Sequence, residues 1–141
     1  MAGHLFALQG DARKLACDAW LLPTDRLIRF TDVWFEGAPD ELARYLDPRH
    51  AAEPWSLLSA RREPERHFQG GRTFELQRWP TRPGVPAATP WATDTGGGRR
   101  TQLRWYLAGI EQFVERASQR VRRLGFRRDK PLLAVPPVGT G

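Results

Sequence analysis

Apolar positions in the last third of the chain follow the spacing of an amphipathic helix. Between residues 101 and 124 they recur at alternating steps of four and three, which places them on one stripe. The stripe consists of Leu103, Leu107, Ile110, Val114, Ala117, Val121 and Leu124. Polar side chains fall off it, where a solvent face is expected: Arg104, Glu111, Glu115, Arg116, Gln119, Arg120 and Arg123. Gly125 is placed to end this helix.

Other runs have the patterns of strands. CDAWLLPTD (17–25) and PLLAVPPV (131–138) are apolar without alternation, which is typical of strands covered on both faces. Pro23 is expected to end the first, because proline has no N–H to donate to a sheet. RTFELQRWP (72–80) alternates and indicates a half-exposed strand, and HLFALQG (4–10) predicts a strand entering a turn.

The middle of the chain has weaker signals. APDELARYLD (38–47) favours a short helix, with Pro39 at its first position. Residues 48–71 are rich in proline and charge and predict a loop containing at most a helical turn. The segment WATDTGGG (91–98), the long helix and the strand at 131–138 form one strand, helix, strand unit, which predicts the α/β class.

Composition limits the chain to one domain and excludes some kinds of site. At 141 residues, with six Trp and seven Phe, it supports one core, while 12 Pro and 13 Gly imply long irregular connections. The single cysteine, Cys17, excludes a disulfide framework and a zinc site of several cysteines. His4, His50 and His67 lack the spacing of metal ligands, so we expect no metal.

The net charge of +6 is concentrated locally. The basic residues of segment 116–130 are Arg116, Arg120, Arg122, Arg123, Arg127, Arg128 and Lys130. A basic helix end is usually a solvated face that complements the helix dipole, so we do not expect nucleic-acid binding. The start of the chain lacks a secretory leader, and no run approaches the roughly 18 apolar residues of a membrane span. We therefore expect a cytoplasmic protein without membrane contact.

Candidate chemistry lies mainly in turns that follow strands. Cys17 borders an apolar strand and is expected to be a buried, unreactive thiol, while capping and turn roles account for Asp18 and Asp25. The turns are QGD (9–11), PTD (23–25), TDTGGG (93–98) and GTG (139–141). In α/β sheets, loops at the carboxyl ends of strands bind ligands, and helix N-termini there favour phosphate. Convergence of these turns indicates a ligand site, whereas isolated turns are only tight connections.

The order of these motifs resembles that of macro domains, which bind ADP-ribose. Such domains begin with a strand ending in Gly-Asp, then a short turn and a strand ending in Asn-Ala-Ala-Asn, and this chain has GDARKLACDAWLLPTD. A later helix leads to a strand ending in a glycine-rich phosphate loop, to which AVPPVGTG is similar. The resemblance covers residues 4–25 and about 91–141, and implies a macro-like three-layer α/β/α fold with a mixed central sheet.

The resemblance also implies a set of ligand-binding residues. Asp11 is expected beside the adenine amino group with the Ala12 backbone, and Gly139, Thr140 and Gly141 around a phosphate. The complete expected set is Gly10, Asp11, Ala12, Pro23, Thr24, Asp25, Gly139, Thr140 and Gly141. ADP-ribose or NAD is the implied ligand, and no further cofactor is required.

One departure from the macro pattern bears on catalysis. Hydrolytic macro domains place an asparagine against the distal ribose, where this chain has Asp25. The resemblance therefore favours binding, as a sensor or regulatory module, over removal of ADP-ribose, for which Asp25 is the only candidate catalytic residue. A scaffold without ligand, or an interaction module whose basic segment contacts an acidic partner, is the alternative.

The same motifs resemble the N-terminal region of bacterial proteins with a downstream sirtuin-like, NAD-handling domain, some of which act in phage defence. Residues 1–141 are then expected to form a single macro-like domain at the N-terminus of a longer protein. Because no helix follows the GTG turn in this sequence, the fold is expected to be incomplete at its C-terminal end.

Overall fold

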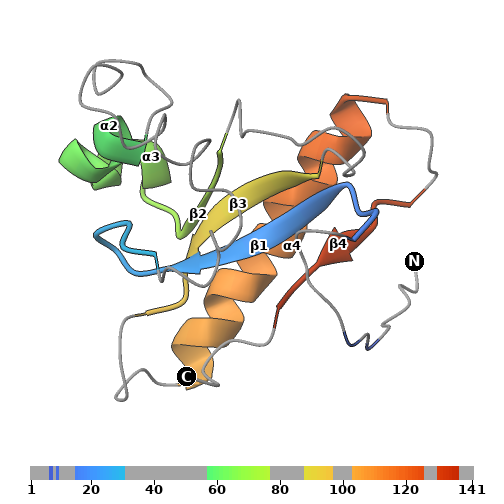
Figure 1. The fold of residues 1–141 in the computed structure, drawn as a ribbon, viewed down its shortest axis with the longest axis horizontal. Helices are drawn as coiled ribbons and strands as arrows, with labels where there is room; N and C mark the ends of the chain where they lie inside the picture. The colour runs from blue at the N-terminus through green and yellow to red at the C-terminus, as the bar shows by residue number, and fades with distance from the viewer. Residues whose placement is uncertain are drawn as a thin grey trace.

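The computed structural model describes residues 7, 9, 15–30, 57–76, 88–96, 103–125 and 130–136. The elements in chain order are β1 (Ala19–Thr24), α2 (Leu57–Arg62), α3 (Pro64–Phe68), β2 (Thr73–Glu75), β3 (Thr89–Asp94), α4 (Leu103–Arg123) and β4 (Leu133–Ala134). Figure 1 shows the four strands in one sheet, in the order β2-β3-β1-β4. β1 is parallel to both β3 and β4, and β2 is antiparallel to β3. The fold is therefore of the α/β class that the sequence predicts, and its sheet is mixed.

Alternate residues of the strands build a core on each face of the sheet. On one face, Trp20 and Leu22 of β1 pack in a cluster with Ala60 of α2 and Phe68 of α3. On the other face, Leu21 packs with residues of β3 and α4. In Figure 1, α4 passes behind the strands, and α2 and α3 lie beside β2. The sheet thus has helical partners on both sides.

β1 is the buried strand that its sequence predicts, but it does not end at Pro23. Ala19–Leu22 are almost fully buried, and the strand continues to Thr24. The carbonyl of Thr24 accepts from the Thr95 N–H of the β3 side, so the backbone of Pro23 points the opposite way. There β4 pairs only with Ala19 and Trp20 in the described residues. Among the residues that the structure describes, Pro23 therefore removes no hydrogen bond from the ladder.

α4 forms where the periodicity predicts it and ends at Gly125, which adopts a positive φ of 65°. The predicted stripe is only partly the buried face. Gly109, Phe113, Ala117 and Val121 are buried, whereas Leu103, Leu107, Val114 and Leu124 are exposed. A Cβ at Gly109 would lie 2.9 Å from the Asp94 carbonyl oxygen. The buried face of α4 is rotated relative to the predicted stripe, because Gly109 and Ala117 let the helix lie close to the sheet. A pattern of large apolar residues does not show this effect.

Two arginines of the basic segment face the sheet instead of solvent. Arg116 donates to the Thr73 carbonyl at 3.0 Å, and Arg120 forms an ion pair with Glu75 at 3.0 Å. Both side chains are partly buried, contrary to the prediction that they lie on a solvent face. They stabilise the packing of α4 on β2, so the basic segment is less of a free cationic surface than its sequence indicates.

The remaining predictions have mixed outcomes. The stretch predicted to be mostly loop contains α2 and α3, and the first turn of α3 includes Pro64. Phe74 and Leu76 are buried beside a less buried Glu75, but Thr73 is also fully buried, so the alternation predicted over 72–80 is present only in part of its described residues. β4 is parallel to β1 but short, and Leu132 and Val135 beside it are exposed, so it is not covered on both faces. Of the strand predicted at 4–10 only residues 7 and 9 are described, and neither is in a strand, while the helix predicted at 38–47 lies outside the described residues.

Candidate functional site

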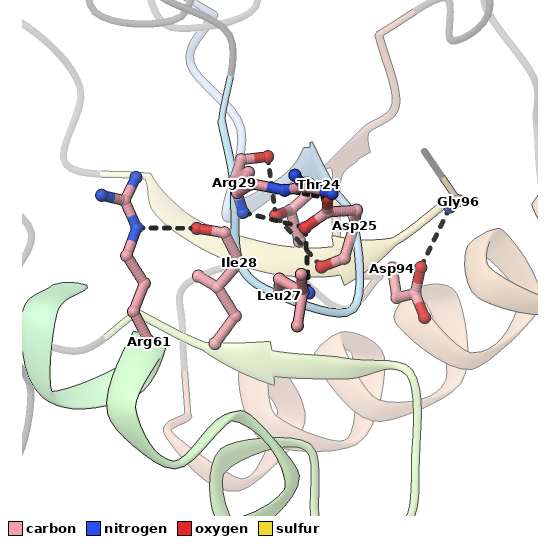
Figure 2. A network of polar contacts seen from close by, with 8 residues as sticks. All are labelled: Thr24, Asp25, Leu27, Ile28, Arg29, Arg61, Asp94 and Gly96. Atoms are coloured by element: carbon pink, nitrogen blue, oxygen red, sulfur yellow. Dashed lines mark hydrogen bonds and ion pairs between the residues drawn. The ribbon is translucent and has the colours of Figure 1, made fainter. Parts of the chain in front are cut away.

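β1 and β3 end side by side at the same edge of the sheet. They are parallel, Thr24 is paired with Asp94, and the Thr95 N–H donates to the Thr24 carbonyl at 3.0 Å. Figure 2 shows the two turns that follow, with Asp25 in one and Asp94 and Gly96 in the other. This carboxyl edge is where α/β sheets place their ligands. The PTD turn (23–25) and the described part of the TDTGGG turn (93–96) therefore meet at this edge.

The loop after β1 is organised by the carboxylate of Asp25. Its Oδ1 accepts from the N–H groups of Leu27 at 2.9 Å and Arg29 at 3.0 Å, and its Oδ2 pairs with Arg29 Nε at 2.6 Å (Figure 2). Thr24 Oγ1 donates to the Arg29 carbonyl at 3.1 Å and closes the same loop. Both oxygens of Asp25 thus have partners within the loop, which is the turn role that its sequence position indicates.

Contacts with α2 and α3 hold this loop in an unusual conformation. Ile28 has a φ of 57°, which a β-branched residue rarely adopts, and its side chain is fully buried. The Ile28 carbonyl accepts from Arg61 Nε of α2 at 2.9 Å. Arg26 pairs with Glu65 of α3 and donates to the Gly71 carbonyl at 2.6 Å. Strain of this kind persists only where the surroundings fix the backbone.

The ion pair of Arg26 shifts the pKa of both partners. The hydrogen bond to Glu65 raises the pKa of Arg26, against a smaller opposing effect of burial. The charges of Glu65 and Asp94 act in the same direction as the hydrogen bond. The hydrogen bond from Arg26 in turn lowers the pKa of Glu65. The negative charge of Asp94 therefore acts on the Arg26 guanidinium at the same edge of the sheet.

Asp94, at the end of β3, has one carboxylate oxygen without a hydrogen-bond partner. The residue is only 1% exposed. Its Oδ1 accepts from the Gly96 N–H at 3.0 Å and from Trp105 Nε1 of α4 at 3.4 Å. Its Oδ2 is buried and has no hydrogen-bond partner. Because an unpaired buried acceptor costs free energy, such a group is often the point where a ligand binds.

A second buried polar atom without a hydrogen-bond partner lies close to the same tryptophan. The Arg72 guanidinium carbon is 3.4 Å from the ring centroid of Trp105, and Arg72 Nη1 is buried with no hydrogen-bond partner. The backbone of Arg72 is fixed, since its N–H donates to Gln112 of α4 and its carbonyl accepts from the Asp94 N–H at 2.7 Å. Trp105 is thus flanked by a cation over its ring and a carboxylate at its N–H.

Of the residues predicted for the site, Pro23, Thr24 and Asp25 lie at this edge. Gly10, Asp11, Ala12, Gly139, Thr140 and Gly141 lie outside the described residues. The sequence indicates the TDTGGG turn as a candidate site, but it does not single out Asp94, Arg72 or Trp105. Asp94 had a usable signal, because an aspartate that ends an apolar run just before glycines stands at a strand's carboxyl end. Arg72 and Trp105 had none, because only the packing of α4 on the sheet brings them together.

Searches for related proteins and for other kinds of site add no family assignment. No protein-family model matches the chain, and no curated protein or solved structure resembles it significantly. Within the described ranges, no three His, Cys, Asp or Glu side chains gather as a metal site would require. No helix in that part of the chain has the length and apolar character needed to cross a membrane.

Proposed function

We propose that the chain binds ADP-ribose, NAD or a related nucleotide at the carboxyl edge of β1 and β3, as a sensor or regulatory module. The observation that carries the proposal is the buried Asp94 Oδ2, which has no hydrogen-bond partner and lies where two parallel strands end together. A carboxylate accepts hydrogen bonds from ribose hydroxyls and from exocyclic amines, and nucleotides offer both.

Sequence motifs support the choice of ligand. GDARKLACDAWLLPTD and AVPPVGTG resemble the adenine and phosphate elements of macro domains. The pairing of Trp20 with Ala134 in β1 and β4 is compatible with this order, because one residue comes from each segment. A macro-like fold, and a place in a larger sirtuin-like defence protein, belong to the same proposal. Asp11 remains its predicted adenine contact.

Binding is favoured over hydrolysis because Asp25, the candidate catalytic residue, has partners for both carboxylate oxygens in its own loop. A general base needs an oxygen within hydrogen-bond reach of the water that it activates. Release of free ADP-ribose from a modified protein by this chain would favour the hydrolase alternative.

Calorimetric titration of ADP-ribose and of NAD into the chain tests the proposal. We expect saturable heat and a higher unfolding temperature with at least one of them, because a ligand that binds the folded state stabilises it. Adenine alone and ribose 5-phosphate serve as part-ligand controls. Absence of both heat and thermal shift with ADP-ribose and NAD at millimolar concentration would contradict the proposal.

A further inference from the structure

Two buried polar atoms near one indole have opposite hydrogen-bonding character. Asp94 Oδ2 accepts and Arg72 Nη1 donates, and both have no hydrogen-bond partner. Trp105 connects the two residues, since its Nε1 donates to Asp94 Oδ1 and its ring lies beneath the Arg72 guanidinium. Among the described residues no ion pair joins Arg72 to Asp94, although the two side chains contact the same ring.

The chemistry of the two atoms restricts the group that could bind to both. A phosphate is disfavoured beside Asp94, because two anions would lie next to each other at a buried carboxylate. An aliphatic group leaves both atoms unpaired, which is costly for buried polar groups. A neutral hydroxyl donates to the carboxylate and accepts from the guanidinium. With two vicinal hydroxyls, one can donate to the carboxylate while the other accepts from the guanidinium.

We infer that Asp94 and Arg72, whose side chains both contact Trp105, form a subsite for the cis-diol of a ribose. The inference rests on the proposed nucleotide binding and specifies which part of the nucleotide these residues contact. The phosphates of the ligand then lie away from Asp94.

The surroundings fix both side chains before a ligand arrives. The Gly96 N–H orients Asp94, and Gly96 adopts a φ of 87° that suits glycine. The Asp94 N–H is in turn bound to the Arg72 carbonyl at 2.7 Å, so the two backbones are coupled. Gly109 lets α4, which carries Trp105, lie against the Asp94 carbonyl. Groups held in this way lose little conformational entropy on binding.

Nucleosides that differ in one hydroxyl test the inference without a phosphate. We would titrate adenosine, 2′-deoxyadenosine and 3′-deoxyadenosine into the parent chain, into Asp94→Asn and into Arg72→Lys. Adenosine is expected to bind the parent about tenfold or more tightly than at least one deoxynucleoside, the loss typical of a hydrogen bond to a charged group. Asp94→Asn and Arg72→Lys are expected to reduce this discrimination, because the first loses an acceptor oxygen and the second the planar donor fork.

Asp18→Asn is the matched control. Asp18 precedes β1 at the opposite end of the strand, where its Oδ2 accepts from the Leu132 N–H at 2.7 Å. The control should discriminate between the nucleosides as the parent does. Thermal melts establish that each variant is folded, and if Asp94→Asn is not, the deoxynucleoside series on the parent decides alone.

The outcomes separate this inference from the proposed function. Equal binding of all three nucleosides, no binding of adenosine at millimolar concentration, or unchanged discrimination in a folded Asp94→Asn would overturn the diol subsite. ADP-ribose and NAD, titrated in parallel, report on the proposed function. Binding of ADP-ribose with no effect of Asp94→Asn removes the subsite and keeps the function. Diol-dependent binding of adenosine without binding of ADP-ribose or NAD keeps the subsite and removes the function.

Discussion

Asp25 follows β1, and Asp94 is the last residue of β3, the parallel strand beside it. The two carboxylates lie at one edge of the sheet but differ in what they contact. Asp25 has partners for both oxygens, all within the next four residues of its loop. Asp94 is more deeply buried, yet one of its oxygens has none. A carboxylate at the end of a strand is thus not by itself a sign of a binding site. The hydrogen bonds already made by its oxygens separate a residue that builds a loop from one that has capacity for a ligand.

The largest effect on stability is expected from displacing α4, which packs against the backbone of Asp94. Gly109→Val places a side chain 2.9 Å from the Asp94 carbonyl oxygen and 3.3 Å from Thr93 Cγ2, so the helix must shift. Overpacking of this kind lowers the free energy of unfolding by about 3 kcal/mol. Urea unfolding measures it, with Gln119→Val at an exposed position of α4 as the control for helix propensity. Equal stability of the two variants would show that the close approach is unimportant.

Removing the Asp25 carboxylate should destabilise the loop after β1. Asp25→Ala leaves the N–H groups of Leu27 and Arg29 without their acceptor, which costs about 1–2 kcal/mol in the free energy of unfolding. Asp25→Asn should recover most of it, because an amide oxygen still accepts from both. Urea unfolding of the two variants checks this order, and an alanine variant as stable as the parent would contradict the structural role of Asp25.

The corresponding change at Asp94 should have little effect on stability. Asp94→Asn keeps an oxygen for the Gly96 N–H and Trp105, while it removes a buried negative charge that has an unpaired oxygen. We expect a free energy of unfolding within about 1 kcal/mol of the parent, measured without nucleotide. A loss as large as that of Asp25→Ala would mean that both aspartates are structural, and the contrast between them would disappear.

The smallest effect concerns the exposed ion pair between Arg26 and Glu65, which ties the β1 loop to α3. Its hydrogen bond lowers the pKa of Glu65 below the value of the unfolded chain, which is about 4.3. The stabilisation is therefore complete above that value and is lost as the pH falls through the lowered folded pKa. Urea unfolding across this acid range should show a shallower loss for Glu65→Gln than for the parent. Identical acid profiles would remove the ion pair from the account.

The sequence predicts the central features of the fold because each has a local signal. The apolar run of β1, the length of α4 and the glycine after it are all present as expected. The buried face of α4 is not, since small residues at Gly109 and Ala117 set the approach to the sheet and have little weight in an apolar pattern. The prediction that β1 ends at Pro23 is wrong for a related reason. Whether a proline interrupts a strand depends on which neighbouring strand its backbone faces, and the sequence does not show this.

The candidate site also has one part with a local sequence signal and another part that depends on packing. The PTD turn and residues 93–96 of the TDTGGG turn are predicted from their positions at strand ends, and they do meet at one edge. Which aspartate keeps a free oxygen depends on turn geometry after each strand, and Arg72 reaches Trp105 only through the packing of α4 on β2 and β3. Contacts between residues distant in the chain leave no periodic signal, so this part of the site follows from the structure alone.

The central claim, that Asp94 and not a strand-end carboxylate in general is built to bind, is tested most directly by titrating ADP-ribose into the parent, Asp94→Asn and Asp18→Asn, with thermal melts alongside. We expect the parent and Asp18→Asn to bind with equal affinity, and Asp94→Asn to bind about tenfold or more weakly while it melts close to the parent temperature. Parent-like affinity in Asp94→Asn would contradict it.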